Sequence, residues 1–302
     1  MSTTDSTPPF HKKLEIRQHS MAIYDLAIPV NDTVITASAD CFVATWDLLS
    51  GTQKGFTIKA DFPVYSIELV EKDLLSVGLN NGDLHIIDIH SKKEIRFFKK
   101  HTSALFSQLF IPQKSVLITG DADGNMAVWN TKSWEILIYI PLGCGKIRSI
   151  ISSPDSEQLF IGGQDGKIRI FTTDFYNEID SFYAHKDGVN ALAIFPGSSS
   201  LLLSGGKDGY LRIWDLDKNE KIKALPAHNY AVYAIAFSPD GKAFATASRD
   251  KSIKIWDTAS YQVLQKLETK TGGHSHSVNK IKWTPSGLFS ASDDRRLIHW
   301  VH

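Results

Sequence analysis

The sequence predicts an all-β protein, a seven-bladed β-propeller in which each blade is a four-stranded antiparallel sheet. Three observations lead to this prediction. Short segments of alternating apolar residues recur along the chain at intervals of 41 to 44 residues, and most of them end in Trp. Four short strands with turn sequences between them fit into each interval. No long pattern with helical periodicity appears. A repeat of this length with four strands is typical of a propeller blade.

Seven positions mark the repeat. Each closes a strand of alternating apolar residues, as in Ser252 to Trp256, and tight-turn pairs such as Asp208-Gly209 precede several of these strands. Asp and Gly suit such turns because they tolerate the backbone angles of a two-residue hairpin. The seven marks are Trp46, Ile87, Trp129, Phe171, Trp214, Trp256 and Trp300.

Composition limits the function. Of the 302 residues 42% are hydrophobic, and 33 basic residues balance 33 acidic ones, so the formal net charge is zero. A chain without a positive excess has no general attraction to phosphates, and nucleic acid is not an expected partner. No apolar stretch is long enough to cross a membrane, and Met1 to Pro9 lacks the apolar run of a secretory signal. With Cys41 and Cys144 far apart, we expect free thiols and a cytoplasmic location, with the nucleus as an alternative.

Two further residue types recur in register with the marks. Five repeats have a His four residues before an aliphatic residue, as in His228 and Val232. Six have an Asp six residues before the mark, as in Asp250 and Trp256. The combined pattern resembles the WD-repeat β-propeller family over essentially the whole chain. The resemblance implies that His, Ser, Asp and Trp of one blade form a buried hydrogen-bond chain, here called a tetrad.

By this resemblance the tetrad is complete in the first, sixth and seventh repeats. A Ser, His and Asp set could also be a hydrolase triad, but this set recurs in several repeats, whereas a catalytic site is normally built once, and no G-x-S-x-G elbow is present. We therefore expect a structural role. The predicted members are His19, Ser38, Asp40 and Trp46; His228, Ser248, Asp250 and Trp256; and His274, Ser292, Asp294 and Trp300.

Two repeats depart from the pattern. The second has Ala60, Asn81 and Ile87 where His, Asp and Trp are expected, and the fourth has Gly143 and Phe171 in place of His and Trp. Their spacing still fits, so both are predicted to be blades, although less rigid ones. The third repeat has its Asp at Asp123.

The last repeat lacks an outermost strand, because the chain stops two residues after Trp300. Phe10 to Gln18 precedes His19 much as an outer strand precedes the His of other repeats, so this segment is predicted to complete the last blade. Such closure removes exposed sheet edges. Residues 1–9 are predicted to be a disordered tail and residues 10–302 a single propeller domain.

The resemblance also implies where a partner would bind. The residue after the aliphatic partner of each His, together with the residue before each turn Asp, points at the mouth of the central channel on the narrow face. Four of the first set are aromatic, which is the composition of a binding hot spot. The predicted partner-binding residues are Tyr24, Tyr65, Phe106, Arg148, Asn190, Tyr233, Asn279, Lys207 and Arg249.

The sequence therefore favours a non-catalytic scaffold that binds partner proteins or peptides at this mouth, as a monomeric propeller within a larger complex. The alternative is an enzyme or small-ligand-binding propeller that uses the same mouth. The predicted mouth holds one Asp and no His or Cys, which weighs against catalysis. No zinc pattern and no nucleotide-binding loop is present, so neither a metal nor a cofactor is expected.

Overall fold

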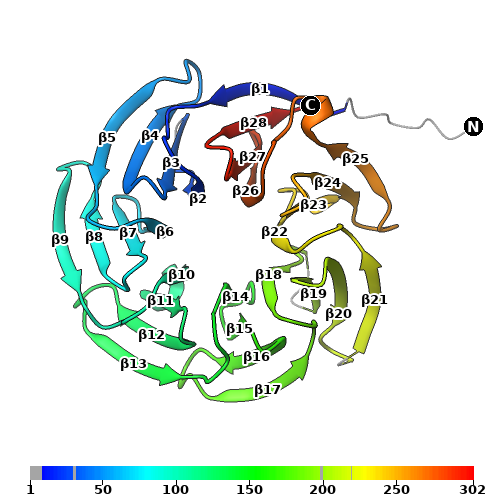
Figure 1. Ribbon diagram of the computed structural model, residues 1–302. Helices are drawn as coiled ribbons and strands as arrows, with labels where there is room; N and C mark the ends of the chain where they lie inside the picture. Colours follow the sequence, from blue (N-terminus) through cyan, green and yellow to red (C-terminus); the bar gives the residue numbers. More distant parts are fainter. Residues whose placement is uncertain (1–8, 30–31, 198–199, 219) are drawn as a thin grey trace, which may run out of the picture.

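The structure is a computed structural model that describes residues 9–29, 32–197, 200–218 and 220–302. It is a closed ring of seven four-stranded antiparallel sheets, the predicted seven-bladed propeller (Figure 1). In each blade the first strand lies innermost, beside the central channel, and the chain then steps outward strand by strand. The predicted N-terminal tail, residues 1–9, falls outside the described residues except for Pro9.

The strands of the first four blades follow the chain in order. Blade 1 holds β2 (Ile23–Ala27), β3 (Thr33–Ser38), β4 (Phe42–Asp47) and β5 (Gln53–Lys59); blade 2 holds β6 (Val64–Val70), β7 (Leu74–Leu79), β8 (Leu84–Asp88) and β9 (Lys93–Phe98); blade 3 holds β10 (Leu105–Ile111), β11 (Val116–Asp121), β12 (Asn125–Asn130) and β13 (Ile136–Pro141); blade 4 holds β14 (Ser149–Ser152), β15 (Gln158–Gly162), β16 (Lys167–Thr172) and β17 (Glu178–Tyr183).

The remaining blades repeat the arrangement, and the last one takes its outer strand from the start of the chain. Two short 3-10 helices, Pro112–Lys114 and Thr269–Thr271, lie in connections. Blade 5 holds β18 (Val189–Ile194), β19 (Leu201–Gly206), β20 (Tyr210–Asp215) and β21 (Glu220–Pro226); blade 6 holds β22 (Val232–Phe237), β23 (Ala243–Ser248), β24 (Ile253–Asp257) and β25 (Val263–Leu267); blade 7 holds β26 (Val278–Thr284), β27 (Gly287–Ser292), β28 (Leu297–Val301) and β1 (His11–Ile16).

The core is divided among the interfaces between blades. Seven apolar clusters are formed, and each combines buried residues from two neighbouring sheets. The cluster between blades 6 and 7, for example, joins Ile255 to Val278 and Trp300. The middle strands are buried on both faces, whereas outer strands such as β9 are largely exposed. Burial of apolar surface between sheets is therefore what holds the blades in a ring.

The prediction that the N-terminal segment completes the last blade is confirmed. Strand β1 pairs antiparallel with β28, from His11 opposite Val301 to Ile16 opposite Leu297. Phe10, just before β1, is buried and meets the ring of Trp283 edge to face at 5.4 Å. Its backbone also exchanges two hydrogen bonds with the side-chain amide of Gln265 in blade 6, at 2.7 and 2.8 Å. The closing strand is thus fixed to two blades.

Among the described residues, no helix is long and apolar enough to span a membrane.

Deletion of residues 1–18 is expected to lower the melting temperature sharply, because it removes β1, exposes the edge of β28 and uncovers the side of Trp283. Thermal unfolding followed by circular dichroism measures this effect. The matched control is deletion of residues 1–8, which keeps β1 and Phe10 and should melt near the full chain. A chain without residues 1–18 that melts like the full chain would show that β1 is dispensable for closure.

Candidate functional site

Hydrogen-bonded tetrads brace the loops that surround the channel mouth. In blade 1, Nδ1 of His19 lies 2.9 Å from the Asp40 carboxylate, and Nε2 lies 2.7 Å from the hydroxyl of Thr36. The indole N–H of Trp46 donates to the same hydroxyl at 2.7 Å. His19, Thr36 and Trp46 are buried, so each bond replaces one that water would otherwise supply.

The chemistry of the groups is consistent with one direction along this chain. An indole N–H can only donate, so the hydroxyl oxygen accepts from Trp, and its own proton is available for Nε2 of His. In this arrangement Nε2 is unprotonated, and Nδ1 carries the proton and donates to the carboxylate. A neutral His with this tautomer satisfies every group in the tetrad. The tetrad is therefore stable with His uncharged and Asp ionised.

The prediction of the hydroxyl member was wrong. The residue that links His to Trp lies ten positions before the Trp, not eight. Ser38 instead accepts the backbone N–H of Asp40 and donates to the carbonyl of Met21, and the same turn contacts are made in blades 6 and 7. The linking hydroxyls are Thr36, Thr119, Ser204, Thr246 and Ser290; the serines that close the turns are Ser38, Ser248 and Ser292.

Tetrads are also more numerous than predicted. Blade 3 has one in which His101 binds Asp121 at 2.7 Å, and Asp121 is fully buried. Asp123, the residue expected from the spacing, is exposed, and its backbone N–H donates to Asp121. Blade 5 has another tetrad, built on His185 and Asp208. Five of the seven blades are therefore braced in this way, and sequence spacing found three.

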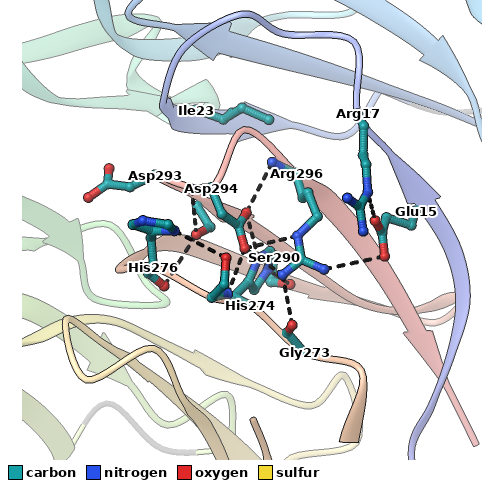
Figure 2. A network of polar contacts seen from close by, with 12 residues as sticks. Glu15, Arg17, Ile23, Gly273, His274, His276, Ser290, Asp293, Asp294 and Arg296 are labelled. Atoms are coloured by element: carbon teal, nitrogen blue, oxygen red, sulfur yellow. Dashed lines mark hydrogen bonds and ion pairs between the residues drawn. The ribbon is translucent and has the colours of Figure 1, made fainter. Parts of the chain in front are cut away.

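In blade 7 the tetrad extends to the closing strand (Figure 2). Arg296 donates through Nε and Nη2 to the carboxylate of Asp294, at 2.9 and 2.6 Å, and through Nη2 to the carbonyl of Gly273. Its Nη1 lies 3.4 Å from Glu15 on β1. One buried guanidinium thus joins the tetrad of the last blade to the strand that closes the ring.

Blade 4 replaces the tetrad with an ion pair. Where other blades have His, it has Gly143, and the guanidinium of Arg169 takes both carboxylate oxygens of Asp165, at 2.6 and 3.2 Å. Bidentate pairs of this kind are strong and directional. The predicted loosening of blade 4 is therefore offset by this pair.

The pKa values of the tetrad residues in blade 5 agree with a neutral His and an ionised Asp. Burial would raise the pKa of the Asp208 carboxyl, but hydrogen bonds from His185, the backbone N–H of Tyr210 and Arg212 prevail and lower this pKa to about 2. Burial lowers the pKa of His185 below its usual value, against the opposing effect of Asp208. Burial likewise lowers the pKa of His274. Both histidines thus resist protonation in the folded protein.

A backbone irregularity aims six of the nine predicted partner-binding residues at the channel mouth. Six innermost strands have a bulge directly after their first residue, and the residue that is skipped in the pairing is the predicted one. A bulged residue leaves the ladder and its side chain is turned away from the sheet. In blade 4 Arg148 lies just before β14. The bulged residues are Tyr24, Tyr65, Phe106, Asn190, Tyr233 and Asn279.

All seven first-set residues line one cavity of about 360 Å³. On one side of it the rings of Tyr24 and Tyr65 stack at 4.7 Å between centroids, and Phe106 meets Tyr65 edge to face at 5.0 Å. The guanidinium of Arg148 lies 4.6 Å from the centre of the Phe106 ring. Blades 1 to 4 thus present one continuous stack. Burial, with Tyr65 and Asp293 nearby, raises the pKa of Tyr24 to about 12, so its hydroxyl remains protonated.

The other side of the mouth is basic. An adjoining cavity lies over blades 4 to 6 and contains the remaining two predicted residues, Lys207 and Arg249. Four cationic side chains line it, and Asp187 is the one carboxylate in its lining. The cations are Lys146, Arg148, Lys207 and Arg249.

Three residues that line the larger cavity were not predicted: Asp25, Lys146 and Lys280. Asp25 accepts the backbone N–H of Ile67 in blade 2 at 3.1 Å and pairs with Lys280 of blade 7 at 3.0 Å, so it ties three blades together. Asp25 and Lys280 each follow a bulged residue, and this position is the signal that could have identified them. Lys146 comes from a loop of irregular spacing, which offers no such signal.

Within the described part of the chain, no three His, Cys, Asp or Glu side chains are grouped as a metal site requires.

Comparison with known proteins agrees with the fold. The family model of the WD domain, G-beta repeat, matches residues 11–47, 92–130, 138–172, 176–215, 219–257 and 265–300, together about three quarters of the chain. The chain therefore belongs to the WD-repeat family. The longest stretch left unmatched, residues 48–91, contains most of blade 2, the blade without a tetrad or an ion pair in its place.

Several curated proteins are similar at low identity. Nuclear distribution protein PAC1 of Arthroderma benhamiae is 24% identical over 317 residues, covering 97% of this chain and 61% of the relative. WD repeat-containing protein 55 of Bos taurus is 23% identical, covering 85% and 69%. Guanine nucleotide-binding protein subunit beta of Solanum tuberosum is 24% identical, covering 66% and 56%. The chain spans about three fifths of the length of the PAC1 relatives.

Thr246→Val is expected to destabilise the protein by about 1–3 kcal/mol, because Nε2 of His228 and the indole N–H of Trp256 both lose a buried partner. Chemical denaturation measures the change. Thr258→Val is the matched control, because the buried hydroxyl of Thr258 has no hydrogen-bond partner among the described residues. Equal losses in the two variants would contradict the assignment of Thr246 to the tetrad.

Acidification is expected to destabilise the protein in two stages. The pKa values of His185 and His274 are lowered by folding, so the stability that depends on their neutral forms is complete above pH about 6.5 and declines below it. The pKa of Asp208, lowered to about 2, adds a second loss as the pH falls from about 4 to 2. The free energy of unfolding against pH measures both stages.

The control for the first stage is the double variant His185→Gln/His274→Gln. It should be less stable at pH 7 but lose less stability between pH 7 and 5 than the parent. An unchanged slope over that range would contradict the assignment.

Proposed function

We propose that the protein is a non-catalytic interaction scaffold whose channel mouth binds a segment of a partner protein. WD-repeat proteins typically act in protein interactions. The observation that carries the proposal is the bulge in six innermost strands, which places four aromatic side chains around one cavity of about 360 Å³. Aromatic and Arg side chains held rigidly at a concave surface are the usual anchors of protein binding.

The chemistry of the mouth suggests the kind of segment it takes. The stack of Tyr24, Tyr65 and Phe106 offers apolar faces over blades 1 to 3, and the cationic side chains lie over blades 4 to 6. A segment with an apolar part followed by acidic residues matches both sides. With a net charge of zero, the cationic cluster is local, which favours an acidic peptide over a long polyanion such as nucleic acid.

The mouth is poorly equipped for catalysis. Of the residues that line the larger cavity, two are carboxylates. Asp25 is engaged by two backbone N–H groups and Lys280, and Asp293 accepts the amide of Asn279 at 2.7 Å. Both carboxylates already have partners within the protein, and no His or Cys is among the described lining residues. WD-repeat propellers are generally not enzymes.

Two further parts of the proposal rest on the sequence. We place the protein in the cytoplasm or nucleus because its two cysteines are far apart, and both Cys41 and Cys144 are unpaired thiols. We take it to be monomeric within a larger complex.

The triple variant Tyr65→Ala/Phe106→Ala/Tyr233→Ala is expected to lose most partner proteins, because truncating one anchor can cost about 2 kcal/mol of binding free energy. Affinity capture from cell extract with quantitative mass spectrometry measures the loss. Lys207→Glu/Arg249→Glu should reduce capture of partners with acidic segments more than of others.

Phe175→Ala is the matched control, because Phe175 is an aromatic residue with 75% of its surface exposed that does not line the mouth. Capture of every partner by a folded triple variant would refute the proposal.

A further inference from the structure

A second concave site lies on the side of the ring, between blades 1 and 2. This side cavity has a volume of about 190 Å³ and is formed by β5 of blade 1, the connection that follows it, and strands β7 to β9 of blade 2. Its apolar lining comes from four residues, Ile58, Ala60, Val77 and Ile87, and His85, which is paired with Glu94, also lines it. None of its lining residues lines the channel mouth.

The side cavity occupies the place that a tetrad fills in other blades. Ala60 is at the position of the His in the sequence pattern. Val77 lies ten residues before the mark, at the position of the linking hydroxyl, and Ile87 is the mark itself. Each replacement is smaller than the group it replaces or lacks its polar atom. The space that an imidazole and an indole take up in five sister blades is therefore left open here.

The neighbouring outer strand does not compensate for the missing rings. Phe98 of blade 2 packs on Trp129 of blade 3 with ring centroids 4.7 Å apart, and Phe182 of blade 4 packs on Trp214 of blade 5 at the same distance. The strand registers place Ile58 at the position of Phe98, since each pairs with the residue three before its mark. Between blades 1 and 2 the corresponding pair is Ile58 and Ile87, so both positions hold an isoleucine.

The sister blades also indicate which aromatic ring fits. Where a hydroxyl lies ten residues before the mark, the mark is Trp, and its N–H donates to that hydroxyl. In blade 4, Ile161 takes the place of the hydroxyl, and the mark is Phe171, which has no N–H to satisfy. Val77 likewise offers no acceptor. Burying an indole N–H against it would cost free energy, whereas a phenyl ring loses nothing.

We propose that the side cavity binds the phenyl group of a Phe side chain carried by a partner protein. An apolar cavity of about 150 Å³ is known to hold benzene, so the volume here is sufficient. The rim carries the exposed charged residues Lys59, Asp61, Lys92 and Glu94, two of each sign, which suits a polar peptide backbone around the buried ring. The site is independent of the channel mouth, and its failure would leave the proposed function untouched.

The first test uses toluene as the probe. In protein with labelled Ile and Val methyl groups, a toluene titration should shift the methyl signals of Ile58, Val77 and Ile87 in NMR spectra with one saturation curve. The methyls of Ile161 and Ile213, buried in other interfaces, should stay in place. Absence of a saturable shift at Ile58 and Ile87, or equal shifts at all five residues, would overturn the proposal.

Filling the side cavity from within provides the matched variant. Ile87→Phe gives blade 2 the ring that blade 4 already has, and should abolish the toluene-dependent shifts at Ile58 and Val77 while keeping the fold. Ala60→Phe, which fills the cavity from its rim, serves the same purpose if the first variant does not fold. Undiminished toluene binding by a folded filled variant would overturn the proposal.

The second test determines which residue of a partner segment binds in the side cavity. A random displayed peptide library is selected on the parent protein after depletion on Ile87→Phe. Enrichment of peptides that share a Phe, with at least tenfold weaker binding to the filled variant, is the expected result. The triple variant of the channel mouth should bind the same peptides as the parent does. Selection of peptides without a common Phe would overturn the proposal.

Discussion

Face-to-face burial between neighbouring sheets is the interaction on which the rest of this molecule depends. Each sheet has two apolar faces, and a ring is the arrangement in which every sheet has a neighbour on both sides. Seven interfaces for seven blades leave no face unpaired. The pairing of β1 with β28 completes the last sheet, and Arg296 ties that pairing to the tetrad of blade 7. Channel mouth and side cavity both exist because the interfaces hold the blades at fixed angles.

The tetrads and the mouth are two outcomes of the same local design. In the five blades with a tetrad, the His and Asp fix the loop before the innermost strand, and the bulge that follows turns one side chain toward the channel. A rigid loop keeps that side chain in place, so a partner does not have to order it upon binding. Blade 2 lacks the tetrad but retains the bulge at Tyr65, which is supported by stacking on Tyr24 instead.

The fold was predictable from sequence because a period of 41 to 44 residues and alternating strands are global patterns that single substitutions do not erase. The position of the linking hydroxyl could not be predicted from the sequence. Thr36 and Ser38 are two residues apart on one strand and face the same side of the sheet, so composition alone does not distinguish them. The reach of the Trp46 indole decides between them, and only the strand register shows it.

The Asp of blade 3 could not be predicted from spacing either. Asp121 binds His101 in the tetrad, although the spacing indicates Asp123. The position of the aromatic residues at the mouth could be predicted because a bulge keeps one position in register in six of the seven blades. The side cavity was not predicted. It forms because the side chains of Ala60 and Ile87 are smaller than the His and Trp of a tetrad, and because β5 of blade 1 places Ile58 beside them.

The closing strand has a consequence for how the chain reaches this state. Glu15 and Arg296 are 281 residues apart in sequence, so their contact cannot form during translation until Arg296 has been synthesised. Until then β1 is an isolated strand emerging from the ribosome, with its partner still to be synthesised. The sequence of β1 is suited to this unpaired state. Lys12 and Lys13 are exposed in the folded protein, and lysines on an unpaired strand edge discourage pairing with the wrong strand. The polar character of β1, unremarkable in the closed ring, acts as protection during synthesis.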